Sequence, residues 1–314
     1  MRPLAARLNR SPWIWSFVAT FIAFLAIGVI THRLALNELT VNLGLAGFMV
    51  LVGLGQMFAI TGGGGGIDLS VPSVLTLAAM VDATFTHGAP GWPTAIGIGL
   101  ALVVGLVVGT VNGSLVVGLR LPPIVATLAT GFVLESLIQL YYGSAEAGAP
   151  SAGLETFVRG RWLGLPVMLW IAALATVVFG AVLQSSLFGR RLEATGQNEQ
   201  AARLTGVNVA RVRLGSYVLS GLMASVAGIL LAAYAGGAFM DMGSPYQLGS
   251  IAAVVLGGTL IAGGKGTALG VFGGAALLTF LITLMEASGL SVGLRDVLEG
   301  AIIVLVLAVR RGAD

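Results

Sequence analysis

TGGGGGIDLSVPS, residues 61–73, places five consecutive glycines and an aspartate inside an otherwise apolar region rich in Leu, Val and Met. A glycine costs a helix about 1 kcal/mol relative to alanine, so residues 62–66 interrupt any helix that precedes them. Ser70 and Ser73 follow at positions where a serine can cap the start of the next helix. The stretch therefore predicts two helices separated by an irregular, partly charged segment.

The composition is that of a membrane protein. Of the 314 residues, 57% are hydrophobic and 9% are charged, whereas a soluble domain carries about 25% charged residues. The absence of cysteine excludes disulfides, thiolate metal sites and a cysteine nucleophile. We predict an all-α polytopic membrane protein whose residues 1–314 form a single transmembrane domain.

Apolar runs of spanning length recur along the chain. About ten transmembrane segments are expected, at residues 12–31, 41–60, 73–86, 93–118, 123–142, 163–187, 214–235, 251–263, 267–287 and 296–309. Two of them, 73–86 and 251–263, are short and adjoin glycine-rich helix breaks. The first run is longer than the roughly 7–15 apolar residues of a signal peptide, so we expect a retained span.

The basic residues divide unevenly between the two sides if the segments alternate from a cytoplasmic N-terminus. Twelve then lie on the cytoplasmic side and four on the other, which is the bias that the positive-inside rule describes. Both termini are expected in the cytoplasm, with residues 188–213 as the longest cytoplasmic loop and residues 143–162 as the longest external loop. The basic pI then reflects topology, and no nucleic acid is expected as a partner.

Polar side chains within the predicted spans need hydration or partners. A charge such as that of Asp68 costs about 2.5–3.5 kcal/mol at membrane depth. Two interpretations stay open: a helix break beside a polar cavity, or a cytoplasmic loop with Asp68 in water. Glu135 and Gln139 lie four residues apart on one helical face, where they line a cavity or form an interhelical hydrogen bond. The candidate translocation-path residues are Asp68, Ser70, Ser73, Asn112, Glu135 and Gln139.

Other features predict packing or solvation. Glycines recur at every fourth position in two places: Gly105, Gly109 and Gly113, and Gly266, Gly270 and Gly274. Small residues at this spacing allow helices to approach closely. Asp82 and Glu286 lie near predicted helix ends, where we expect them to be solvated.

The sequence offers no catalytic or metal site. The motifs G-x-S-x-G and H-E-x-x-H are absent. A second interruption, LGGTLIAGGKGTALG at residues 256–270, fails as a phosphate-binding loop at Thr259, where glycine is needed, and at Gly266, where Ser or Thr is needed. We therefore expect no enzyme, no metal and no cofactor bound by this chain.

The loop FGRRLEATGQNEQAARLTGVNVARVR, residues 188–213, resembles the cytoplasmic loop of ABC importer permeases of the ribose or simple-sugar type. The segments TGGGGGIDLSVPS, LRLPPIVATLAT and IAAVVLGGTLIAGGKGT resemble three further motifs of that family, in the same order. The general permease signature E-A-A-x-x-x-G is met except at one position. Gln200 stands where the acid is expected, and Glu199 precedes it.

The resemblance implies the rest of the transporter. A second permease chain, identical or paralogous, would complete the pore, a separate ABC ATPase subunit would bind ATP and Mg²⁺, and a periplasmic sugar-binding protein would deliver substrate. It also implies a short helix over residues 199–206 that lies in a cleft of the ATPase, ends at Gly206 and uses the small Ala202 for close approach. The implied ATPase-coupling residues are Glu199, Gln200, Ala201, Ala202, Arg203 and Gly206.

We therefore expect the permease subunit of an ATP-driven importer for a monosaccharide or related polyol, embedded in the lipid bilayer of the bacterial inner membrane. Two alternatives stay open. One is a permease of the branched-chain amino-acid type, which is a related family. The other is a proton-coupled secondary carrier, for which only Glu135 and Asp68 could titrate within the membrane.

Overall fold

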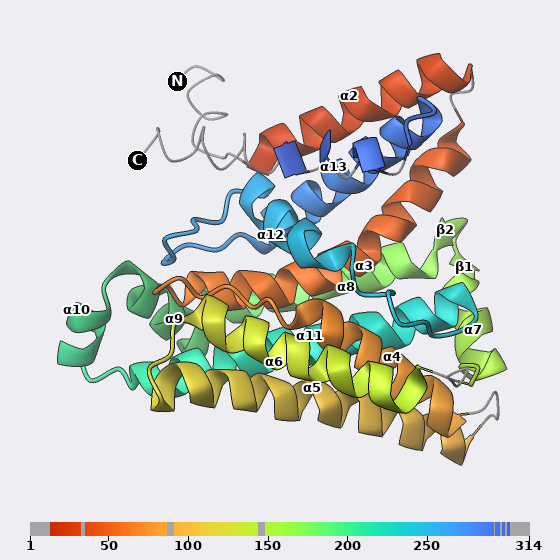
Figure 1. Ribbon diagram of the computed structural model, residues 1–314. Coiled ribbons are helices and arrows are strands. Elements are labelled where there is room, and N and C mark those ends of the chain that lie inside the picture. The colour runs from red at the N-terminus through yellow and green to blue at the C-terminus, as the bar shows by residue number, and fades with distance from the viewer. Residues whose placement is uncertain are drawn as a thin grey trace, which may run out of the picture.

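The computed structural model describes residues 13–32, 35–86, 91–143, 148–291, 293–295, 297–298 and 300–301. Within them, long apolar helices pack side by side into one bundle, and the short elements gather at the two ends of that bundle (Figure 1). The helical class predicted from the composition is confirmed.

Seven of the described helices are long and apolar enough to cross a membrane. They are α2 (Trp13–Thr31), α3 (Leu36–Thr61), α5 (Trp92–Gly118), α6 (Pro123–Tyr142), α8 (Val167–Ser185), α11 (Val209–Ala235) and α13 (Ala268–Ala287). Two shorter apolar helices are α4 (Val71–Thr86) and α12 (Tyr246–Leu256). The first matches the predicted segment 73–86, whereas the predicted segment 251–263 is helical only as far as Leu256. The tenth, 296–309, lies almost wholly outside the described residues, so the number ten and the side of the termini stay predictions.

Short elements mark the ends of the bundle. At one end lie α7 (Ala152–Arg159), β1 (Arg161–Trp162) and β2 (Leu165–Pro166), and at the other lie α9 (Leu187–Gln197) and α10 (Glu199–Leu204) (Figure 1). The two strands form an antiparallel hairpin that the all-α prediction missed. Its turn consists of Leu163 and Gly164, both with positive φ, the geometry of a tight two-residue hairpin.

The two predicted long loops therefore lie at opposite ends. Arg159 Nε donates to the carbonyl oxygen of Tyr234, where α11 ends, and Arg161 donates to Asn37 Oδ1 near the start of α3. At the other end, Gly264 N donates to the carbonyl oxygen of Thr61, the last residue of α3, at 2.9 Å. The described part of the first loop, residues 148–162, and residues 188–213 lie at opposite ends of the bundle, which agrees with the predicted alternation.

Helix α3 is the centre of the bundle. It is buried without interruption from residue 46 to 61 and packs against α11, α13, α8 and α12. A helix that is apolar all round is stable only when neighbours surround it. Helices α5 and α6, by contrast, expose apolar side chains such as Val103, Val107 and Phe132, which suits a surface that faces lipid or another chain.

The glycine repeat of α5 allows this helix to contact α11 backbone to backbone. A Cβ at Gly105 would lie 2.3 Å from the carbonyl oxygen of Gly221, and one at Gly109 would lie 2.5 Å from that of Tyr217. In the second repeat, a Cβ at Gly274 would lie 2.0 Å from the carbonyl oxygen of Ala253 in α12. The predicted helix-packing role is confirmed for the repeat of α5 and for Gly270 and Gly274, whereas Gly266 lies in the loop before α13.

The structure corrects one prediction about charge. Asp82, expected to be solvated, is wholly buried in α4 and lies 3.4 Å from Thr86 Oγ1. It is covered because α5 approaches closely at Gly97, where a Cβ would lie 2.8 Å from Asp82 Oδ1. Glu286, in contrast, is exposed and pairs with Arg295 at 2.6 Å, as expected for a residue at a helix end.

The close approach of α5 and α11 predicts the effect of Gly105→Ala. The added methyl group would meet a backbone carbonyl that cannot rotate away, and overpacking of this kind costs about 1–3 kcal/mol. We expect a lower thermal unfolding midpoint for the purified chain in detergent. The matched control is Gly99→Ala on the same helix, because a Cβ there would have nothing within 4 Å. Equal midpoints for the two variants would contradict the packing assignment.

Candidate functional site

Asp68 lies in a buried polar cluster between the loop before α4 and helix α5. Only 2% of the residue is exposed. Its Oδ1 accepts hydrogen bonds from Ser70 Oγ at 2.6 Å and from Ser70 N at 3.0 Å. Asn112 Nδ2 donates to Ser70 Oγ at 2.7 Å and lies 3.5 Å from Asp68 Oδ1. The interpretation with Asp68 in water is therefore wrong, because protein groups satisfy this carboxylate.

The loop that carries Asp68 is held between α3 and α6. Leu69 N donates to Thr127 Oγ1 at 3.0 Å, and the same hydroxyl lies 3.2 Å from the carbonyl oxygen of Ile67. Gln56 is wholly buried in α3. Its side-chain nitrogen donates to the carbonyl oxygen of Asp68 and its side-chain oxygen accepts from Asp68 N, both at 3.2 Å. The irregular backbone of this loop thus finds the partners that a buried segment requires.

The six translocation-path candidates fall in three places. Asp68, Ser70 and Asn112 form the buried cluster, Ser73 and Glu135 line a separate cavity, and Gln139 is exposed on α6. The cavity measures about 130 Å³, lies between α4, α6 and the segment before α12, and is also lined by Thr76, Asp241, Ser244, Gln247 and Phe132. Carboxylates, hydroxyls and an amide beside one aromatic ring are groups that can hold a polyhydroxylated molecule.

The segment between α11 and α12 forms one wall of this cavity. Gly243 N donates to Thr76 Oγ1 at 3.0 Å, and a Cβ at Gly243 would lie 2.1 Å from the carbonyl oxygen of Pro72. Helix α12 therefore starts beside the first turn of α4. It is only 11 residues long and ends at Leu256. Sequence reasoning missed this wall because residues 236–245 carry no motif.

Residues 188–213 contain the predicted short helix. Asn198 caps α10, since its Oδ1 accepts from Ala201 N at 2.9 Å. After Leu204 the chain reverses through Gly206, which has φ +81°, and Val207 N donates to the carbonyl oxygen of Ala202 at 3.0 Å. This left-handed ending is typical of a glycine after a helix. The helix and its glycine stop are confirmed, with the end at Leu204.

Ala202 faces the opposite way from what we expected. It is 3% exposed and packs inside this chain, so its small size serves internal packing and not the approach of another subunit. The exposed residues of α10 are Gln200, Ala201, Arg203 and Leu204. Leu204 is 89% exposed.

Glu199 ties α10 to the bundle. Its carboxylate pairs with Arg203 at 2.7 Å within α10 and with Arg213 of α11 at 2.8 Å. The hydrogen bond from Arg203, followed by the charge and hydrogen bond of Arg213, lowers the pKa of Glu199 below its ordinary value of 4.5. Because the pKa is lowered on folding, the two ion pairs contribute their full stability above the ordinary value of 4.5. This stability is lost as the pH falls from there through the lowered pKa.

The two glycine-rich interruptions meet each other and the end of α9. A Cβ at Gly263 would lie 2.4 Å from Gly63 Cα, and one at Gly196 would lie 2.0 Å from the carbonyl oxygen of Thr61. Gln197 Nε2 donates to the carbonyl oxygen of Gly264 at 3.0 Å. We call this contact of residues 61–64, 196–197 and 263–266 the glycine junction. The sequence showed each glycine run but not that they pack together.

Glu193 of α9 belongs to the same contact. Burial raises the pKa of its carboxyl, while the backbone N–H of Gly266 and the charge of Lys265 act in the opposite direction. Lys265, which invited a phosphate-loop interpretation, therefore lies near an acid of α9.

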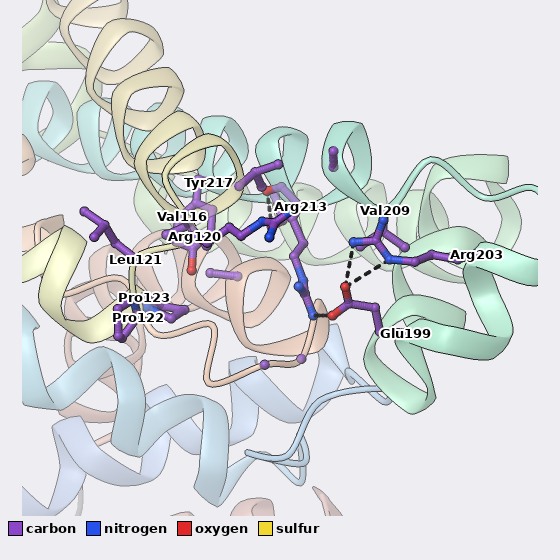
Figure 2. Close-up of a pocket in the computed structure, with 16 residues that line it drawn as sticks. Val116, Arg120, Leu121, Pro122, Pro123, Glu199, Arg203, Val209, Arg213 and Tyr217 are labelled. Carbon is purple, nitrogen blue, oxygen red and sulfur yellow. Dashed lines mark hydrogen bonds and ion pairs between the residues drawn. The ribbon is translucent and has the colours of Figure 1, made fainter.

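A larger cavity of about 320 Å³ opens beside α10 (Figure 2). Its wall includes the charged side chains of Arg120, Arg203, Arg213 and Glu199, together with Tyr217. Arg120 has φ +55°, a left-handed conformation that costs a non-glycine residue about 1–2 kcal/mol. It follows Leu119, the C-cap of α5, and lies two residues before Pro122, the N-cap of α6.

The buried cluster predicts that Asp68→Leu destabilises the fold. The substitution would leave the N–H and O–H of Ser70 without their acceptor, and an unpaired buried donor costs about 1–3 kcal/mol. We expect a lower unfolding midpoint in detergent and less folded protein in the membrane. Asp68→Asn retains one acceptor oxygen and should lose less. An unfolding midpoint at the wild-type value for Asp68→Leu would contradict a structural role for the cluster.

Known proteins match almost the whole chain. Residues 39–307 match the family model described as branched-chain amino acid transport system / permease component. The ribose import permease protein of Escherichia coli (strain K12) is 33% identical over 299 residues, which cover 92% of each chain. The galactose/methyl galactoside import permease protein of Haemophilus influenzae is 30% identical, over 87% of this chain and 82% of its own. The autoinducer 2 import system permease protein of Yersinia pseudotuberculosis is 31% identical, over 93% and 82%.

These matches confirm the resemblance to ABC importer permeases of the simple-sugar type that the motifs indicated. Together with the seven apolar helices, they also confirm a multi-pass protein of the bacterial cell membrane. The chain belongs to the branched-chain amino acid transport system / permease component family.

Proposed function

We propose that the chain is the permease subunit of an ATP-driven importer for a monosaccharide or a related polyol. The observation that carries the proposal is the capped helix α10, which presents the exposed Leu204 at the end of the bundle opposite to α7 and the hairpin (Figure 1). A helix fixed to the bundle by ion pairs can transmit a rigid-body movement of a partner. The likeness to ribose and galactose import permeases supports a sugar as substrate.

The remaining parts of the transporter follow from this assignment. An ABC ATPase subunit would bind α9 and α10 and would hold ATP and Mg²⁺, and a periplasmic binding protein would deliver the sugar at the opposite end. A second permease chain would complete the pore. Glu199, Gln200, Ala201, Arg203 and Gly206 would form the ATPase-coupling element, and Ser73 and Glu135 would line the path.

The test of the function is uptake into liposomes that contain this chain together with an ABC ATPase subunit and a periplasmic sugar-binding protein from the same organism. We expect uptake of labelled ribose or galactose that requires ATP on the side of the membrane where the ATPase subunit lies. This uptake should be insensitive to a proton uncoupler. Uptake of labelled leucine instead would favour the branched-chain amino-acid alternative, which the description of the family model suggests. Uptake driven by a proton gradient without the ATPase would overturn the proposal.

The coupling role predicts the effect of Leu204→Glu. Placing a negative charge in an apolar contact with the ATPase subunit is costly, so that subunit should no longer co-purify with the variant. Because the Leu204 side chain is 89% exposed in the isolated chain, folding should be unaffected. Leu163→Glu is the matched control, because Leu163 is 91% exposed at the opposite end. If both variants retain the ATPase equally well, α10 is not its docking element.

The predicted topology has ten spans with both termini in the cytoplasm. Ala152 of α7 and Ala201 of α10 are both exposed alanines in short helices, and the native chain has no cysteine. We expect a membrane-impermeant thiol reagent to label Ala152→Cys in intact cells. Ala201→Cys, in cells without the ATPase subunit, should react only after permeabilisation. The reverse pattern would invert the topology.

A further inference from the structure

We propose that the 320 Å³ cavity beside α10 is a binding site for a phosphate group. The inference rests on the cavity itself and does not depend on the proposed transport function. The ligand would carry a phosphate monoester or diester. Two kinds of molecule could present this group: a soluble phosphate compound or the headgroup of an anionic lipid.

The charge of the cavity is the first argument. Three guanidinium groups and one carboxylate contribute to its wall, those of Arg120, Arg203, Arg213 and Glu199. Glu199 is shared by two of the arginines. Within the described part of the chain Arg120 has no ion-pair partner. Guanidinium groups bind phosphate oxygens through paired hydrogen bonds, so the excess positive charge favours this anion.

The Tyr217 hydroxyl is the second and independent argument. Tyr217 is 2% exposed, lines the cavity, and its hydroxyl has no hydrogen-bond partner among the described residues. A buried polar group without a partner is rare in a folded protein and calls for an explanation such as an absent ligand. The hydroxyl oxygen itself is enclosed, so a phosphate oxygen in the cavity would reach it, and supply the missing acceptor, after a small shift of the cavity wall. Figure 2 shows Tyr217, Arg120 and Arg213 grouped on the wall of the cavity, with Glu199 and Arg203 on α10.

The backbone at Arg120 supports the same conclusion. A glycine is the usual residue at a left-handed position after a helix, yet the chain has an arginine with φ +55° there. Strained backbone of this kind is concentrated at ligand sites. Here the conformation lets a guanidinium group line the cavity from the link between α5 and α6.

Occupancy of the site would affect α10. Arg213 donates to the Glu199 carboxylate at 2.8 Å, and its Nε lies 3.4 Å from the carbonyl oxygen of Gly62. A phosphate group between Arg120 and Arg213 would compete with Glu199 for the same guanidinium. The ligand would thus act on the contact that holds α10 against α11.

The test uses the full chain in nanodiscs of phosphatidylcholine, with inorganic phosphate as the soluble probe. We expect phosphate to raise the thermal unfolding midpoint in a saturable manner. Arg120→Gln and Tyr217→Phe should weaken phosphate binding by about tenfold or more, the effect of losing a hydrogen bond to a charged group. Arg211→Gln is the matched control, because Arg211 lies on the same helix as Arg213, is exposed and does not line the cavity.

The lipid source is tested in parallel by native mass spectrometry of the chain from nanodiscs that also contain phosphatidylglycerol. Retained phosphatidylglycerol that is lost in Arg120→Gln and Tyr217→Phe but kept in Arg211→Gln assigns the site to a lipid headgroup. A shift by inorganic phosphate with the same pattern assigns it to a soluble ligand. Tyr217→Phe removes only an unpartnered hydroxyl, so folding should persist if Arg120→Gln misfolds. No binding of either probe, or equal losses in all three variants, would overturn the proposal.

Discussion

A backbone that leaves the helical conformation inside a membrane protein must find hydrogen-bond partners within the protein, because lipid offers none. This constraint shapes the present fold. The chain breaks after α3 and again after α12, and each break is covered by the other. Gly264 N donates to the carbonyl oxygen of Thr61. A Cβ on Gly263 would lie 2.4 Å from Gly63 Cα, and one on Gly63 would lie 2.8 Å from Gly196 Cα. Glycine is required here for proximity as much as for conformation, since two backbones in contact leave no space for a Cβ.

The same contact connects the breaks to the short helices at that end. Gly196 and Gln197 close α9 against the glycine junction, and Glu199 holds α10 to Arg213 of α11. Force applied to the outward surface of α10 would therefore reach α3, α11 and the break before α13 through backbone contacts and one ion pair. Packed backbone contacts are stiff because they cannot change rotamer, which favours movement of these elements as one body.

How much of this was predictable depends on whether a feature is local. The helix breaks, the glycine repeat of α5 and the glycine stop of α10 were predicted correctly, since each is determined by residues close in sequence. The burial of Asp82, the inward orientation of Ala202, the β-hairpin at residues 161–166 and the glycine junction were not predicted. Apart from the hairpin, whose turn is local, each of these depends on which helix lies against which. For Asp82 the deciding residue is Gly97 on another helix, and neither position alone shows the pairing.

Helix α11 shows why the candidate site could be found only in part. Its charged and hydroxyl residues Arg213, Ser216 and Tyr217 line the cavity beside α10. Ser220, one turn later on α11, is wholly buried on the side of Asp68. One face of a single helix thus joins the end that carries α10 to the buried cluster at the start of α4. The cavity and the cluster are separated by about one turn, or roughly 5 Å along the axis. A change in the charge around Arg213 would therefore change the electrostatic environment of Asp68. It would also affect the loop that carries Asp68 and leads into the wall of the smaller cavity.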